Sequence, residues 1–162
     1  MKKYLLIIGA VFATASAGFA QSSATLTISG TVAPINTITI ASQSGYNTLD
    51  LVNGASGKVV GIATETSNDK LGYSVHLSSL NAGSTAQAFL KGALTGNADT
   101  VNYSITYGGA AVTLASGSAT VTSVAARTGS SGVTKNIAVT FAGGWLTADA
   151  YSDTLTLTIA GN

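Results

Sequence analysis

The side chains that most often perform acid–base or metal chemistry are few in this sequence. His76 is the only histidine, so a Ser-His-Asp triad or a histidine-based metal site would depend on this one residue. It falls on the polar side of the alternating segment Tyr73 to Ser78, and we therefore expect a surface imidazole. There is no cysteine, which excludes thiol catalysis and thiolate metal ligands.

The carboxylates are spread along the chain, and we expect them in different loops. Their spacing predicts no pair for glycoside hydrolysis. Asn68-Asp69 and Asn97-Ala98-Asp99 lack the repeated oxygen ligands and closing glutamate of a calcium loop, so turns explain them better. Asp153 is expected to cap the turn into the last strand. The six are Asp50, Glu65, Asp69, Asp99, Asp149 and Asp153. The sequence thus favours a protein that is not an enzyme, with no metal and no cofactor.

Trp145 is the only tryptophan, and it follows Gly143-Gly144 in a predicted loop. Exposed aromatic side chains stack on sugar rings or anchor partners, which makes Trp145 a candidate ligand contact. A lone large aromatic is more often buried, however. We therefore expect Trp145 to fold back over one end of the domain.

The elements that would position these residues are strands. The terminal stretch Ala150 to Ala160 places Leu155, Leu157 and Ile159 on one face and threonines on the other, which is the period of a half-buried strand. The segment Ala24 to Val32 has the same period. Its inward set would be Ala24, Leu26, Ile28, Gly30 and Val32.

Shorter segments between these two complete an all-β pattern. Gly108-Gly109 predicts a hairpin, and no convincing helix follows residue 20. Further strands are predicted at Ile38 to Ile40, Thr48 to Val52, Val59 to Thr64, Tyr73 to Leu77, Ala88 to Thr95, Val101 to Tyr107, Val112 to Leu114, Ser118 to Val124 and Lys135 to Phe141. Eight to ten such strands predict an antiparallel β-sandwich.

The first twenty residues read as a secretory signal peptide. Lys2 and Lys3 precede an apolar run that ends in the small-residue site Gly18-Phe19-Ala20. We predict cleavage after Ala20 and a single domain over residues 21–162; a retained membrane anchor is the alternative. The protein would then be exported through the inner membrane to the periplasm, the cell surface or the medium.

The mature chain is almost neutral. From Gln21 onward five basic and six acidic side chains leave a net charge of −1. Nucleic-acid binding needs a basic patch, which this pattern does not contain. No stretch after Ala20 is long and apolar enough to form a transmembrane segment.

Three segments resemble a known group of proteins. They are I-S-G-T-V-A-P (Ile28 to Pro34), Y-S-I-T-Y-G-G (Tyr103 to Gly109) and A-Y-S-D-T-L-T-L-T-I (Ala150 to Ile159). They are similar to the pilin-like β-sandwich proteins of bacteria, in particular the spore coat protein U family and the archaic chaperone-usher pilins. The likeness covers the mature chain loosely, and the last ten residues are its most specific part.

The resemblance implies an incomplete immunoglobulin-like fold that is completed by a strand from the next subunit. By analogy the donor residues would include Leu26, Ile28, Gly30 and Val32. The acceptor edge would include Leu155, Leu157 and Ile159. The implied function is an exported structural subunit of a surface filament or coat such as a fimbrium, with self-association and a periplasmic chaperone as its partners.

Two departures from the family leave an alternative open. The chain lacks the disulfide that many such pilins have, and its leader before Leu26 is very short. If the first strand pairs within its own domain, the sandwich is complete. The protein would then be a secreted monomeric binding or adhesin module.

Overall fold

A computed structural model describes Ser22–Asn162, and it is built from strands, with no helix in that range. The chain divides into two units after Val32, and the compact unit Ala33–Asn162 contains every strand of the described residues. The strands are β1 (Asn36–Ser42), β2 (Gly54–Ser67), β3 (Tyr73–Ser79), β4 (Ala88–Gly92), β5 (Thr100–Tyr107), β6 (Ala110–Val112), β7 (Ser118–Val124), β8 (Val133–Ala142), β9 (Tyr151–Ser152) and β10 (Leu155–Gly161). The predicted all-β class is confirmed.

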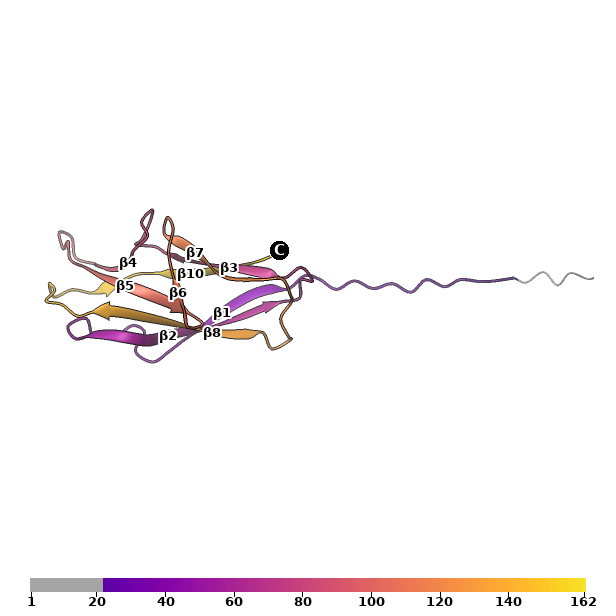
Figure 1. The fold of residues 1–162 in the computed structure, drawn as a ribbon, viewed down its shortest axis with the longest axis horizontal. Coiled ribbons are helices and arrows are strands. Elements are labelled where there is room, and N and C mark those ends of the chain that lie inside the picture. Colours follow the sequence, from indigo (N-terminus) through magenta and orange to yellow (C-terminus); the bar gives the residue numbers. More distant parts are fainter. Residues whose placement is uncertain (1–21) are drawn as a thin grey trace, which may run out of the picture. The chain divides into compact units, whose positions relative to one another are not determined.

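The strands of the compact unit form two antiparallel sheets packed face to face (Figure 1). The larger sheet has the order β1-β2-β8-β5-β4-β9, with β6 paired to β5. The smaller sheet has the order β10-β3-β7. The protein is therefore an antiparallel β-sandwich, as the strand pattern predicts.

Alternation decides which side chains make the core between the sheets. On β3, Tyr73, Val75 and Leu77 are buried, while His76 between them is exposed. Inward residues of β5 and β8 are buried in the same way. The predicted strand at Thr48 to Val52 is wrong, because these residues lie in the turns that lead into β2.

Two glycines form the predicted hairpin between β5 and β6. Gly108 and Gly109 have φ values of 57° and 87°, in the left-handed region that favours glycine. Their backbone lets Tyr107 pair with Ala110. The hairpin prediction is confirmed.

The predicted terminal strand is divided between the two sheets. Its first residues form β9, which pairs with β4 of the larger sheet, and the rest forms β10, which pairs with β3 of the smaller one. Asp153 and Thr154 lie at the crossing. The end of the chain thus connects the two layers.

The segment Ser22–Val32 is not a strand in this structure. Leu26, Ile28 and Val32 have 86%, 88% and 86% of their surface exposed. The predicted strand at Ala24 to Val32 is therefore wrong for the isolated chain, because alternation alone supplies no partner for the backbone. The predicted signal peptide, residues 1–20, lies outside the described residues.

Candidate functional site

Strand β10 lies at an edge of its sheet. Within residues 22–162 it pairs only with β3, in a register that joins Leu157 to Leu77 and Ile159 to Val75. Strand β1 is an edge of the other sheet and pairs only with β2 in the same range. Each of these two strands therefore has one side on which its backbone has no strand partner.

The inward face of β10 is incompletely covered. Leu155, Leu157 and Ile159 alternate with exposed residues as predicted, but each is only partly buried. Leu77, which is level with Leu157 on the neighbouring strand, is 0% exposed. The three predicted acceptor residues thus form an apolar row beside an unpaired backbone, and their role as an acceptor stays a prediction.

An apolar cavity of about 300 Å³ opens between the sheets at the start of β10. Ile40 of β1 and Val60 of β2 contribute to its wall, and Leu155 contributes from β10. Ile137 and Val139 of β8 line it from the larger sheet. Ile40 keeps 46% of its surface exposed, so part of the wall faces solvent. A further apolar side chain placed there would be buried.

Asp153 fixes the start of β10. Its carboxylate accepts hydrogen bonds from the Ser79 hydroxyl at 2.6 Å and from the Tyr103 hydroxyl. It also accepts from the backbone N–H groups of Asn81 and Thr154, at 3.0 and 2.7 Å. Burial raises the pKa of Tyr103, and the hydrogen bond to Asp153 adds to the shift. Asp153 caps this turn as predicted, and it also joins the two sheets.

Glu65 joins the sheets a second time, and the prediction that it lies in a loop is wrong. It lies in β2 and is 0% exposed. Its carboxylate accepts hydrogen bonds from the hydroxyls of Tyr73 at 2.8 Å, Thr122 at 2.7 Å, and Tyr107. Burial and, to a lesser extent, the hydrogen bond from Tyr73 to Glu65 raise the pKa of Tyr73 to about 12.

The error about Glu65 has a local cause. The predicted strand Val59 to Thr64 ends one residue before Glu65. In the structure β2 has irregular pairing with β8 at Val59 to Gly61, and beyond it Ala63 and Glu65 are buried. A bulge changes which residues face inward, and residue types alone do not predict where one occurs.

The candidate donor residues lie in the segment before the sandwich. Leu26, Ile28 and Val32 are exposed, and a Cβ built on Gly30 would have no atom within 4 Å. None of the described residues 22–162 buries this apolar row, and its role as a donor stays a prediction.

Trp145 contradicts its prediction, because its side chain is 100% exposed rather than folded over the sandwich. The backbone on both sides is held: Gly144 N–H donates to the Leu51 carbonyl at 3.0 Å, and Thr147 N–H donates to Asp99 at 2.8 Å. Leu146 packs against the core. The loop therefore presents the indole on a fixed backbone.

The remaining polar candidates do not assemble into a chemical site. His76 is exposed and shares a 3.2 Å hydrogen bond with the Thr120 hydroxyl. Asn97 and Asp69 accept hydrogen bonds from backbone N–H groups two residues later, as predicted for turns. In the part of the chain that the structure describes, no group of three or more histidine, cysteine or acidic side chains is placed to hold a metal ion.

A search for membrane-spanning helices finds none among residues 22–162. No protein-family model and no curated protein matches the sequence.

Proposed function

We propose that this protein is an exported structural subunit of a bacterial surface filament or coat. In the assembly, Ala24 to Val32 of one copy would pair with the open edge of the next. The observation that supports it most is the partly buried inward face of β10 beside an unpaired backbone. β-Strand addition satisfies such an edge, because main-chain hydrogen bonds supply affinity and alternate side chains fill the groove.

The segment and the edge are complementary in length and pattern. The segment offers nine residues with apolar or small side chains at every second position, and β10 has seven residues with the same period. Side chains two residues apart on a strand are separated by about 6.6 Å on either element, so the two rows can interdigitate. The cavity at the start of β10 is apolar, which suits Leu26 or Ile28.

The position of β1 favours pairing between copies over pairing within one. A Cβ built on Gly161 would lie 2.9 Å from the side-chain amide nitrogen of Asn36. The start of β1 therefore lies beside the end of β10. The segment Ser22–Val32 is joined to β1 by Ala33 to Ile35. To pair with β10 of its own copy, it would have to reverse direction within these three residues and run parallel to β10. A second copy is free to pair antiparallel, which is the slightly more stable arrangement.

Export and a helper protein belong to the same proposal. An unpaired apolar edge promotes aggregation before assembly. A periplasmic chaperone that covers β10 until the next subunit arrives would prevent this. The signal peptide predicted at residues 1–20 would bring the chain to that compartment.

The test compares two charged substitutions in the segment. Ile28→Lys places an ammonium group in the apolar row and should abolish assembly, with thermal unfolding of the monomer unchanged. Thr27→Lys changes the opposite face and should still assemble. Light scattering of the exported protein measures both. If Ile28→Lys instead unfolds the monomer, the segment belongs to its own sandwich.

The exposed Trp145 favours a second function, that of a secreted binding or adhesin module. A fully exposed tryptophan on an anchored backbone is typical of a side chain that contacts a partner. This function does not require assembly.

A further inference from the structure

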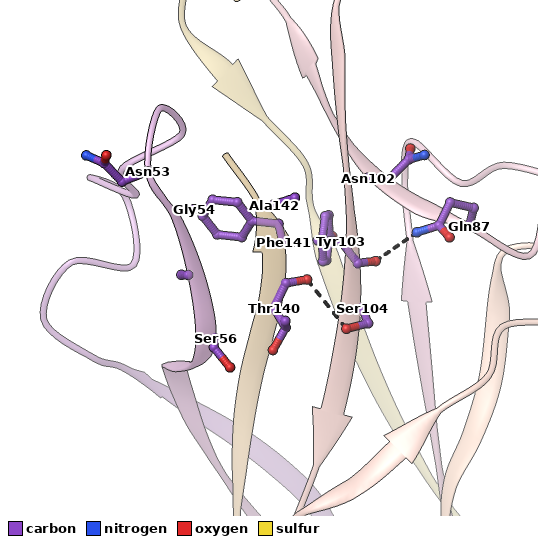
Figure 2. A pocket seen from close by; sticks show the side chains of 11 residues that line it. Asn53, Gly54, Ser56, Gln87, Asn102, Tyr103, Ser104, Thr140, Phe141 and Ala142 are labelled. Atoms are coloured by element: carbon purple, nitrogen blue, oxygen red, sulfur yellow. Dashed lines mark hydrogen bonds between the residues drawn. The ribbon is translucent and has the colours of Figure 1, made fainter. Parts of the chain in front are cut away.

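The outer face of the larger sheet has a concavity of about 640 Å³ near the ends of β2, β5 and β8 (Figure 2). Figure 2 shows Thr140 and Ser104 on adjacent strands, with Asn53 and Ser56 to one side and Gln87 and Asn102 to the other. None of the described residues that line it is charged. The surface thus combines amide and hydroxyl side chains with apolar ones such as Ala55 and Phe141.

Irregular pairing in β2 opens this surface. The pairing of β2 with β8 shifts between Ala55 and Lys58. Gly57 N–H then donates to the Thr140 hydroxyl oxygen at 2.8 Å in place of a ladder partner. This bond leaves the Thr140 hydroxyl hydrogen available to an acceptor.

Several groups of the concavity keep hydrogen-bonding capacity. The side-chain amide of Gln87 donates hydrogen bonds to the Ala88 and Tyr103 carbonyls, at 2.8 and 2.9 Å. Its side-chain oxygen remains free to accept a hydrogen bond. The exposed Asn102 amide has no hydrogen-bond partner among residues 22–162. The site therefore offers both donors and acceptors without charge.

Trp145 belongs to the loop that borders this concavity. Ala142 lines the concavity, and Trp145 follows three residues later. A Cβ at Gly143 would collide with the Val52 carbonyl oxygen, so the two loops are in close contact beside Asn53. Asp50 holds the second loop, accepting from Asn53 N–H at 3.0 Å and from its amide at 2.7 Å.

We propose that Trp145 and the concavity bind an uncharged carbohydrate chain. Sugar rings present C–H faces that stack on an indole and hydroxyl groups that pair with amides and hydroxyls. The lining has no positively charged side chain to neutralise a phosphate or sulfate group, which disfavours nucleotides and acidic polysaccharides. The proposal is independent of assembly, because it uses the outer face of the larger sheet and not β10.

The single tryptophan makes the test direct, because all indole fluorescence of the protein comes from Trp145. The exported protein is titrated with cellohexaose, maltohexaose, mannohexaose and chitohexaose, and with a heparin hexasaccharide as the charged comparison. At least one uncharged probe should shift the emission to shorter wavelength with saturation, and heparin should not. The absence of any saturable shift with the four uncharged probes would overturn the proposal.

Variants measured by calorimetry locate the site. Trp145→Ala should weaken binding of the active probe about tenfold or more, and Trp145→Phe should restore most of it. Asn102→Ala should weaken binding by a smaller factor, and the control Thr156→Ala on the exposed face of β10 should not. Equal affinity in Trp145→Ala would overturn the proposal. So would a fluorescence shift that depends on protein concentration alone, since it would assign Trp145 to contact between copies.

Discussion

Strands β3 and β10 are neighbours in one sheet and share an alternating apolar pattern, yet their inward side chains differ in burial. Val75 and Leu77 of β3 are 0% exposed, and their register partners Ile159 and Leu157 are partly exposed. Among residues 22–162, the central strand β3 has a neighbouring strand on each side, while β10 has one neighbour. Both strands have residues suited to a core, so position in the sheet causes the difference.

The apolar side chains of β10 can therefore still gain free energy from further burial. Complete burial of a leucine or isoleucine side chain stabilises by about 1.5–3 kcal/mol relative to exposure. Only part of that remains for a row that is already partly buried. The burial free energy still available to the three side chains would contribute to the affinity for an added strand. The backbone hydrogen bonds that the added strand makes with the edge would contribute as well.

The largest expected effect is the loss of stability on truncating a side chain of β3, compared with the same truncation in β10. Leu77→Ala should lower the free energy of unfolding by about 2–5 kcal/mol, because it leaves a cavity in the closed core. Leu157→Ala, its register partner, should cost clearly less in the monomer but should weaken assembly. Chemical denaturation of monomeric protein measures the first effect, and light scattering measures the second. Equal losses in the monomer would contradict the difference between closed and open strands.

A second effect concerns the link between the sheets that both strands depend on. Glu65→Ala removes the acceptor of three hydroxyl groups and leaves them buried without it, which should cost about 1–3 kcal/mol or more. Asp99→Ala, at a carboxylate on a loop, serves as the comparison and should cost less. Denaturation midpoints measure both variants, and a smaller loss for Glu65→Ala would mean that its hydrogen bonds do not hold the sheets.

The third effect is a pH dependence at the buried end of β3. The pKa of Tyr73 is raised from 10.0 to about 12, so the folded state favours the neutral hydroxyl. Its contribution should be complete below pH 10 and should be lost as the pH rises through about 12. The difference in unfolding free energy between wild type and Tyr73→Phe should therefore shrink over this interval. Tyr103 and Tyr107 are present in both proteins and titrate in both, so the change in the difference comes mainly from Tyr73. A constant difference would contradict the assignment.

The smallest effect is expected at Trp145. Because the indole is fully exposed, Trp145→Ala should change the free energy of unfolding by no more than about 0.5 kcal/mol. Thermal unfolding checks this. A loss comparable to that of Leu77→Ala would mean that the side chain packs against the sandwich.

The period of two predicted most of the fold but not how its strands are completed. It identified β3, β5 and the face of β10 that bears Leu155, because alternation depends on neighbours in the chain. It did not identify the burial of Glu65, which depends on irregular pairing in β2, or the exposure of Trp145, which depends on contacts between distant loops. It predicted a strand at Ala24 to Val32 that the isolated chain does not form, because alternation assigns side chains to faces but does not supply a backbone partner.

The most direct test of the open edge uses the chain that starts at Ala33, titrated with a peptide of Ser22 to Val32. We expect one peptide to bind each chain, with slower backbone hydrogen exchange confined to β10 and β1. Failure of the folded chain to bind the peptide, or unfolding of the chain on removal of the segment, would contradict the account.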